Sequence, residues 1–424
     1  METTEQEDTR AWVLHPDIRS DRERKDAKPA LDEAIALAHA LPGLSVGGGE
    51  IVRLPKAHPG KLFGKGKLAE LAERFHEDEV ELVVIDGPVT PVQQRNLEKE
   101  WKLKVLDRTG LILEIFSDRA RTREGVLQVE MAHLSYQRTR LVRAWTHLER
   151  QRGGLGFVGG PGETQIEADR RAIDDQLTRL KRQLDKVVRT RELHRAARAK
   201  VPFPIVALVG YTNAGKSTLF NRLTGADVFA KDMLFATLDP TMRRVVLPTG
   251  AEVILSDTVG FISNLPTQLV AAFRATLEEV LEADLILHVR DIAHPDTEAQ
   301  AKDVEAILHD LGVSKDTEVI EVWNKVDLVD PDHRQALQTL ADRTEGVFTM
   351  SALTGEGVAP LMTAVSDTLD SERSERVLQL DYSDGKRRAW LHQEGIVTAE
   401  TEREGGFDIT VRWTARQEKN YRDL

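Results

Sequence analysis

Short apolar runs alternate with amphipathic segments in the first part of the chain. Residues 81–86 and 103–107 have the composition of buried strands, and residues 67–75 and 91–101 have the apolar spacing of helices. Strands that alternate with helices are typical of parallel sheets, because each crossover between parallel strands needs a long connection. The pattern therefore predicts an N-terminal α/β subdomain over residues 29–118.

The same alternation returns after Pro204. It predicts six strands, at residues 205–209, 242–247, 252–255, 285–289, 318–323 and 347–350. Pro202 and Pro204 cannot continue a preceding helix, so we expect a domain boundary at this point. A second α/β domain is predicted over residues 203–370.

The two ends of the chain have other patterns. Residues 1–28 are polar and highly charged, which predicts a disordered tail. Residues 371–376 are charged and are expected to be a linker to a small C-terminal α+β domain, residues 376–424. The strands of that domain are expected near residues 377–380, 396–402 and 407–413.

Residues 119–200, between the two α/β domains, have the heptad spacing of long helices. The apolar positions are Leu127, Met131, Leu134, Leu141, Trp145 and Leu148 in one segment, and Ile166, Ile173, Leu177, Leu180, Leu184 and Val187 in the next. The connection between the segments, residues 153–164, contains six glycines. Two such helices joined by a short loop predict an antiparallel coiled-coil hairpin with a glycine-rich tip.

The predicted hairpin differs from the rest of the chain in charge. The formal net charge of the chain is −12, but residues 119–200 hold 19 Lys and Arg against 10 Asp and Glu, a net of +9. A basic segment in an acidic protein indicates a polyanionic partner, although a solvated helical surface would have a similar composition. The side chains expected to face phosphates are Arg119, Arg121, Arg123, Arg138, Arg140 and Arg143 on the first arm, and Arg170, Arg171, Arg179, Lys181 and Arg182 on the second.

The overall composition excludes several classes of protein. The chain has no cysteine, which rules out a disulfide scaffold, a thiol nucleophile and a thiolate zinc site. No stretch approaches about 18 uncharged apolar residues, so no membrane-spanning helix is expected. The acidic first ten residues do not have the apolar core of a secretory signal.

Residues 210–217, Gly-Tyr-Thr-Asn-Ala-Gly-Lys-Ser, match a phosphate loop between a predicted strand and a predicted helix. The glycines let backbone N–H groups surround phosphates at the helix N-terminus. Lys216 is expected to reach the β- and γ-phosphates, and Ser217 to offer its hydroxyl to Mg²⁺. The motif thus predicts a nucleoside triphosphate site.

Three later motifs, each after its own predicted strand, indicate which nucleotide binds. Residues 257–260, Asp-Thr-Val-Gly, can hold Mg²⁺ through water and sense the γ-phosphate. In residues 324–327, Asn-Lys-Val-Asp, the Asp327 carboxylate can accept hydrogen bonds from guanine N1–H and N2–H₂, which adenine lacks. Asn324 is expected at the other edge of the base and Lys325 along the ring, and residues 351–353 are expected to close over guanine O6.

These four motifs resemble the G1, G3, G4 and G5 boxes of translation-factor-type GTPases. Residues 93–98, 107–113 and 153–171 further resemble the HflX family of ribosome-associated GTPases. The resemblance covers roughly residues 30–370 and is weaker over the last 50 residues. It implies a Ras-like G domain, preceded by an α/β unit with the hairpin and followed by the small C-terminal domain.

The resemblance also implies a switch-I box at residues 235–239, with Thr237 as a second Mg²⁺ ligand beside Ser217; Thr241 is the competing candidate. Lys216, Thr237 and Gly260 are the expected catalytic residues. The residues expected to bind GTP are Gly210, Tyr211, Thr212, Asn213, Ala214, Gly215, Lys216, Ser217, Phe235, Ala236, Thr237, Leu238, Asp239, Asp257, Thr258, Val259, Gly260, Asn324, Lys325, Val326, Asp327, Ser351, Ala352 and Leu353.

Phe261 follows the Asp257–Gly260 motif where many GTPases have a glutamine that orients the attacking water. Because phenylalanine cannot hydrogen-bond to water, we expect slow intrinsic hydrolysis that needs a partner, unless another side chain positions the water unaided. The resemblance to HflX implies that this partner is the large (50S) ribosomal subunit, bound through its rRNA in a GTP-dependent way.

The same resemblance implies a monomeric, cytoplasmic factor that splits or rescues stalled ribosomes or supports subunit maturation under stress. Membrane association and a second nucleotide site in the N-terminal unit stay open. Two other hypotheses remain: a nucleotide-gated RNA- or ribosome-binding protein with incidental turnover, and an RNA-remodelling or RNA-modifying factor.

Overall fold

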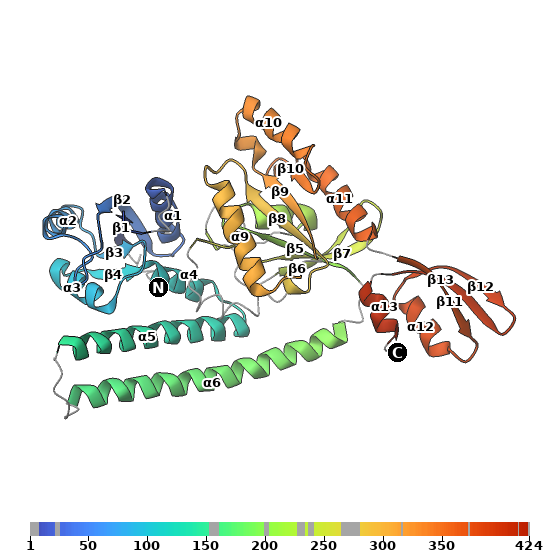
Figure 1. The fold of residues 1–424 in the computed structure, drawn as a ribbon, viewed down its shortest axis with the longest axis horizontal. Helices are drawn as coiled ribbons and strands as arrows, with labels where there is room; N and C mark the ends of the chain where they lie inside the picture. The colour runs from blue at the N-terminus through green and yellow to red at the C-terminus, as the bar shows by residue number, and fades with distance from the viewer. Residues whose placement is uncertain are drawn as a thin grey trace, which may run out of the picture. The chain divides into compact units, whose positions relative to one another are not determined.

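Figure 1 shows the fold in a computed structural model. The structure describes residues 8–21, 26–151, 161–198, 203–226, 234–235, 241–263, 280–314, 317–371, 374–413 and 415–422. These residues form two compact units. The first unit contains the described residues up to Val188, together with the short segments 234–235 and 259–263, and the second contains the others.

The first unit is built on a four-stranded parallel sheet in the order β2-β1-β3-β4. The strands are β1 (Thr9–Ile18), β2 (Leu44–Leu54), β3 (Leu82–Ile85) and β4 (Lys104–Asp107). The helices are α1 (Ala27–His39), α2 (Lys65–Glu77), α3 (Pro91–Trp101) and α4 (Arg108–Arg119). Helices α2 and α3 bury Leu71, Phe75, Leu97 and Trp101 against one face of the sheet, and α1 and α4 contact each other and the strands.

The prediction of a disordered tail over residues 1–28 is wrong for Thr9–Ile18, which form strand β1. Strand β1 lies inside the sheet and pairs on both sides, with β2 and with β3. Ala11, Val13 and Leu14 are fully buried there, which explains why this charged stretch is ordered. The apolar positions are too few and too widely interrupted by His15, Pro16 and Asp17 to stand out as a strand in the sequence.

The hairpin helices are α5 (Arg123–Gln151) and α6 (Pro161–Arg198), which lie side by side in opposite directions (Figure 1). An ion pair of 2.7 Å joins Arg138 Nε on α5 to Asp174 Oδ1 on α6. On α6, Leu180 is buried and the other apolar positions at three- and four-residue spacing are half-buried between exposed residues. Residues 153–160 of the predicted glycine-rich connection lie outside the described residues, and its last four residues, 161–164, are the first residues of α6 and not part of a loop.

The second unit contains a six-stranded sheet in the order β10-β9-β8-β5-β7-β6, in which only β6 and β7 pair antiparallel. The strands are β5 (Ile205–Gly210), β6 (Thr241–Val246), β7 (Glu252–Asp257), β8 (Leu285–Asp291), β9 (Glu318–Asn324) and β10 (Val347–Thr349). All six predicted strands are therefore confirmed.

The helices around this sheet are α7 (Lys216–Thr224), α9 (Thr297–Leu311), the 3₁₀ turn η1 (Val326–Leu328), α10 (Pro331–Ala341) and α11 (Val358–Ser371). Phe220 of α7 and Leu361 of α11 pack with Leu208 and Leu287 of the central strands in one buried core. Because β5, β7, β8 and β9 are parallel, their carboxyl ends meet at one edge of the sheet, where α/β proteins bind ligands.

The C-terminal part is a three-stranded antiparallel sheet with two helices, as expected for a small α+β domain. Its elements are β11 (Ser374–Asp381), α12 (Gly385–Gln393), β12 (Val397–Arg403), β13 (Gly406–Trp413) and α13 (Ala415–Arg422). Residues 374–376, predicted as a linker, are instead the start of β11, because they pair with Trp413, Arg412 and Val411 of β13. None of the described helices is long and apolar enough to cross a membrane.

Candidate functional site

The predicted phosphate loop connects β5 to α7, and two of its glycines are required by the backbone. Gly210 has φ +152°, and a Cβ there would lie 2.1 Å from the carbonyl oxygen of Val289. Gly215 has φ +94°, and its Cβ would lie 2.2 Å from Nδ2 of Asn324. Any side chain would collide at either position, so the loop can take this shape only with glycine.

Lys216 is the first residue of α7, and its side chain turns back over the loop. Its Nζ donates to the carbonyl oxygens of Gly210, at 3.1 Å, and Tyr211, at 2.8 Å. Burial lowers the pKa of Lys216 to about 8, opposed by the nearby Asp257 carboxylate. The described residues that accept hydrogen bonds from this buried ammonium do so through neutral carbonyl groups, so a phosphate placed beside it would be strongly favoured.

Ser217 and Asp257 meet at the same edge of the sheet. The Ser217 hydroxyl donates to Asp257 Oδ2 at 2.7 Å, and Asp257, the last residue of β7, is fully buried. A hydroxyl and a carboxylate are oxygen ligands of the kind that Mg²⁺ prefers. In the described part of the chain no cluster of three or more His, Cys, Asp or Glu side chains could hold a metal. Among the described residues, Ser217 and Asp257 are therefore the pair that fits a Mg²⁺ ion at this edge, with phosphate oxygens and water as further ligands beside the predicted Thr237.

Asn324 is the last residue of β9 and connects two loops. Its Nδ2 donates to the carbonyl oxygen of Ala214 at 2.7 Å, and its Oδ1 accepts from the Ala352 N–H at 2.8 Å. The side chain is almost completely buried. The sequence predicts Asn324 at the edge of the base, but its amide in this structure ties the phosphate loop to residues 351–353.

The other members of this motif follow directly. Lys325 has φ +66°, and its Nζ forms a 2.9 Å ion pair with Asp291 Oδ2 at the end of β8. Asp327 lies in η1 and is partly exposed. Ser351 is buried, and its hydroxyl accepts from the Thr354 N–H at 3.1 Å, which shapes the turn after β10.

Arg222 is a residue of this site that sequence reasoning missed. It lies on α7, and its Nε donates to the carbonyl oxygen of Ala352 at 2.6 Å; its Nη2 donates to that of Leu353. It thereby holds residues 351–353 against the helix that begins at the phosphate loop. No motif marks such a residue, because its partners are backbone carbonyls about 130 positions away.

The described switch residues belong to the first unit. Phe235 is buried at φ +56°, and its ring packs edge to face on Phe116 with the centroids 4.6 Å apart. Val259, Gly260 and Phe261 are buried as well. Ala236, Thr237, Leu238 and Asp239 lie outside the described residues, so the choice between Thr237 and Thr241 stays a prediction.

The basic side chains of the hairpin divide into two groups. Arg119 and Arg140, predicted to face phosphates, are instead buried inward: their side chains are 13% and 19% exposed, and they donate to Ala40 O and Asp107 Oδ2. Arg119 also belongs to α4 and not to the first hairpin arm. On α6, Arg170 and Arg171 are 51% and 77% exposed.

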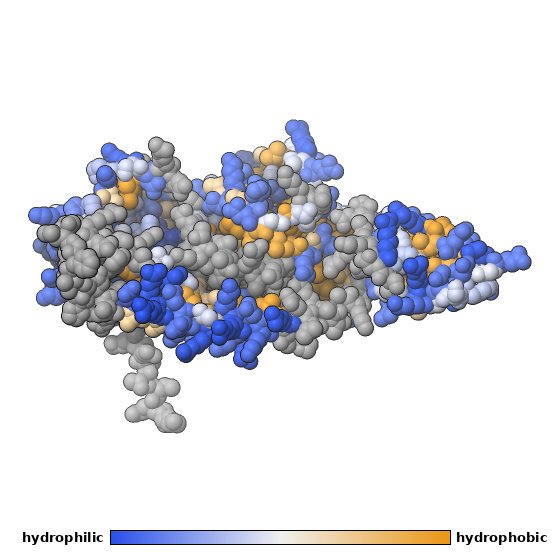
Figure 2. Space-filling model, turned by 60° about the horizontal axis from the view of Figure 1, so that its bottom comes forward, coloured by the Kyte–Doolittle hydropathy of each residue, from blue (hydrophilic) through white to orange (hydrophobic). Residues whose placement is uncertain are grey.

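Arg179, Lys181 and Arg182 are also exposed on α6. In Figure 2, hydrophilic side chains cover the surface where the described part of α6 lies. The side chain of Arg143 lies outside the described residues. On the first arm, Arg121 and Arg123 are exposed and the Arg138 side chain is 43% exposed, so both arms present cationic side chains, with more of them on α6.

Comparison with known families covers nearly the whole chain. Residues 28–117 match the GTP-binding GTPase N-terminal model, and residues 119–198 match the GTP-binding GTPase middle region. Residues 205–325 match the 50S ribosome-binding GTPase model, and residues 336–423 match the HflX C-terminal domain. The fold and the four nucleotide motifs thus define a phosphate-loop GTPase that binds guanine nucleotides.

Curated relatives narrow this class. A GTPase HflX of Magnetococcus marinus is 51% identical over 381 residues, which are 90% of this chain and 86% of the relative. A GTPase HflX of Escherichia coli is 43% identical over 356 residues, 84% and 83% of the two chains. The chain belongs to the HflX family of GTPases.

A solved structure has a similar fold. The crystal structure of the complex of SsGBP with GDP aligns with a TM-score of 0.50 and 24% identity, over 85% of this chain and 98% of the other.

Proposed function

We propose that this GTPase binds the large ribosomal subunit in its GTP state and is released after hydrolysis that the subunit stimulates. The predicted site residues then have defined roles. Lys216 contacts the β- and γ-phosphates, Ser217 and Thr237 contribute hydroxyls to Mg²⁺, and the Gly260 N–H senses the γ-phosphate. Asp257 would help to hold the ion. Magnesium would supply neutralisation of the phosphate charge.

Guanine selection is assigned to Asp327 and to residues 351–353. The observation that carries this assignment is the Asn324 amide, which joins the phosphate loop to the loop of Ala352 at 2.7 and 2.8 Å. The Asn324 side chain fixes the phosphate loop and the loop of Ala352 relative to each other. A guanine base bound next to Asp327 and phosphates bound next to Lys216 are therefore assigned to the same nucleotide. An Asp327→Asn variant exchanges an acceptor for a donor, and should lose GTP affinity and gain affinity for xanthosine triphosphate.

The hairpin is assigned to rRNA. Support comes from its net charge of +9 and from the exposed arginines of α6. RNA is recognised largely by shape and backbone, and a glycine-rich tip lets the protein backbone approach folded RNA closely. Ordered GTP-bound switch segments would favour the bound state, and their release after hydrolysis would end it.

The biological task that fits this cycle is splitting or rescue of stalled ribosomes in the cytoplasm, or maturation of the large subunit under stress. The protein acts as a monomer in this proposal. A gated binder with incidental turnover is the main alternative, because Phe261 gives no group for water activation.

Co-sedimentation with purified 50S subunits tests the proposal. With a non-hydrolysable GTP analogue we expect binding that is lost with GDP, and lost when Arg170, Arg171 and Arg179 are changed to Glu. Lys302→Glu, Glu305→Lys, a charge exchange on α9 in the second unit, is the control. Equal binding with both nucleotides would contradict the nucleotide-gated cycle.

A further inference from the structure

Two consecutive residues at the start of α4 bind different parts of the molecule. Asp107 ends β4 and Arg108 begins α4. The Asp107 carboxylate receives hydrogen bonds from the hairpin helix α5, whereas the Arg108 guanidinium is bonded to Ser263, three residues after Gly260. Neither contact belongs to the nucleotide site described above.

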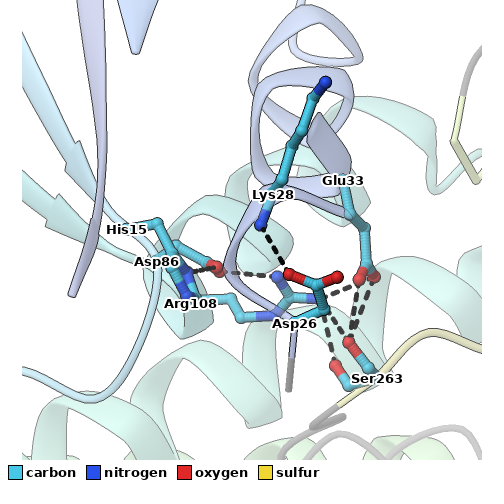
Figure 3. A network of polar contacts seen from close by, with 7 residues as sticks. All are labelled: His15, Asp26, Lys28, Glu33, Asp86, Arg108 and Ser263. Atoms are coloured by element: carbon cyan, nitrogen blue, oxygen red, sulfur yellow. Dashed lines mark hydrogen bonds and ion pairs between the residues drawn. The ribbon is translucent and has the colours of Figure 1, made fainter. Parts of the chain in front are cut away.

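The Arg108 contacts form a buried network (Figure 3). Nη1 donates to Asp86 Oδ1 at 2.6 Å, and Nη2 donates to Glu33 Oε1 at 2.8 Å. Nη2 also donates to the carbonyl oxygen of Ser263 at 3.1 Å and to its Oγ at 3.2 Å. The Ser263 hydroxyl donates to Glu33 Oε2 at 2.9 Å. Arg108 and Glu33 together therefore bind the hydroxyl and the carbonyl oxygen of Ser263.

Asp86 and His15 support the far side of the guanidinium. His15 Nδ1 lies 2.7 Å from Asp86 Oδ2. Burial acts to raise the pKa of the Asp86 carboxyl, but the hydrogen bond from His15 and the charge of Arg108 outweigh it and lower that pKa. Arg108 is therefore fixed between two carboxylates at the carboxyl ends of the sheet and has little room to move.

The Asp107 contacts anchor the hairpin. Oδ1 accepts from the Gly110 N–H at 2.8 Å, which caps α4, and from the Tyr136 hydroxyl at 2.6 Å. Oδ2 accepts from Arg140 Nη1 at 3.0 Å, and Arg140 also donates to Gln94 on α3. Tyr136 and Arg140 are one turn apart on α5, so a shift of this helix pulls on the residue next to Arg108.

Helix α4 itself is suited to transmit such a shift. Leu111, Ile112, Ile115 and Phe116 are all buried to 1% exposure or less, so the helix is packed along its length. Its Phe116 contacts Phe235 of the predicted switch-I box, and Arg108 contacts Ser263 after the Asp257–Gly260 motif. Packed interiors shift as units instead of deforming locally.

We propose that α4 couples the hairpin to the switch segments, with Arg108 as a positioning residue that holds Ser263 until α5 moves. The proposal rests on the proposed function, since the movement of α5 is assigned to binding of the 50S subunit. Hydrogen bonds weaken steeply with distance and angle, so a displacement of Asp107 that is passed to its chain neighbour Arg108 would weaken the bonds between Arg108 and Ser263.

Two mild variants test the coupling from opposite ends of the network. Tyr136→Phe removes a hydroxyl on the hairpin side, and Ser263→Ala removes one on the switch side. Each should lower the ratio of the 50S-stimulated to the basal GTPase rate by about fivefold, the effect of one buried hydrogen bond. The double variant should be no worse than the stronger single variant, because both act through one path. Arg74→Ala, which breaks an ion pair with Glu50 on α2 and β2, is the matched control with an unchanged ratio.

Single variants with wild-type ratios, or effects that multiply in the double variant, would overturn the proposal. Arg108→Lys gives a further check, since lysine keeps the charge but cannot bond Asp86, Glu33 and Ser263 together. Its thermal unfolding midpoint shows whether the first unit still folds.

Amide hydrogen exchange of residues 259–263 separates this inference from the proposed function. Tyr136→Phe, which is far from this segment in sequence, should accelerate exchange there without any ribosome present. Unchanged exchange contradicts the coupling. If exchange rises but wild-type hydrolysis is not stimulated by 50S subunits, the coupling stands and the ribosome-activated cycle fails.

Discussion

Arg222 donates a 2.6 Å hydrogen bond from Nε to the carbonyl oxygen of Ala352, and so connects α7 to the loop predicted to close over guanine. This side chain thereby joins the helix that begins at the phosphate loop to the loop at the predicted base end of the site. A second bond, to the carbonyl of Leu353, fixes the direction of the guanidinium.

Arg222→Ala should therefore weaken binding of GDP and GTP by about tenfold, since two hydrogen bonds from a charged group to the carbonyl oxygens of residues 352 and 353 are lost. Fluorescence titration with a labelled guanine nucleotide measures the change. Arg244→Ala removes an exposed ion pair with Glu252 and is the control. Equal affinities for Arg222→Ala and wild type would show that this connection does not matter for binding.

Lys216 predicts a pH dependence of nucleotide affinity. Burial holds its pKa at about 8 without a ligand, and phosphate charges would raise that pKa in the complex. Below pH 8 the ammonium is already charged, so affinity is flat. Above pH 8 the amine must take up a proton on binding, so affinity should fall by up to about tenfold per pH unit.

Calorimetry of GDP binding at pH 8.5, in two buffers with different ionisation enthalpies, measures the proton taken up. Uptake of a substantial fraction of one proton is expected at this pH, where the GDP phosphates are fully ionised and Lys216 is partly deprotonated. An enthalpy that does not depend on the buffer at pH 8.5 would rule out titration of Lys216.

His288, in the middle of β8, predicts a loss of stability in acid. Burial is the main cause that lowers its pKa from 6.5 to about 4, and its Nε2 has no hydrogen-bond partner among the described residues. The unfolded chain binds the proton more tightly, so stability that is complete above pH 6.5 is lost as pH falls towards 4. The loss amounts to roughly 3 kcal/mol for a shift of this size.

His288→Gln, which cannot take up a proton, should flatten that part of the profile, although it is less stable at neutral pH. Urea unfolding between pH 4 and pH 7 measures both. His309, exposed at the end of α9, is the matched position for a His→Gln control. A slope in His288→Gln equal to that of wild type would assign the acid sensitivity to other groups.

The sequence predicts those parts of the fold whose apolar or motif residues follow one another directly along the chain. The central strands β5 and β8 are near-continuous apolar runs, and each nucleotide motif lies at or directly after the end of a strand, which is why the strands and the motifs could be located. Strand β2 contains Gly47, Gly48 and Gly49, where side chains would collide with Trp12 or Ile35 at two of the three positions. Because three successive glycines interrupt the apolar positions of β2, the sequence of this segment does not predict a strand.

The contacts that sequence reasoning missed are all long-range. In the sequence, Arg140 is one of several cations on a basic helix. In the structure α5 lies close to the end of β4, and Arg140 donates a hydrogen bond to Asp107. Ser263 has no motif of its own, and its role depends on Arg108, 155 positions away. A count of charged residues predicts the sign of the net charge of a segment. It does not predict which of the charged side chains are exposed.

The central claim is a switch whose hydrolysis is triggered through the hairpin by the large ribosomal subunit. The most direct test is the GTPase rate with and without purified 50S subunits, for wild type and for a variant without residues 153–162. We expect a large stimulation of wild type that the deletion abolishes, with basal rate and GDP affinity unchanged. A wild-type rate that stays flat when 50S subunits are added, or stimulation that survives the deletion, would contradict it.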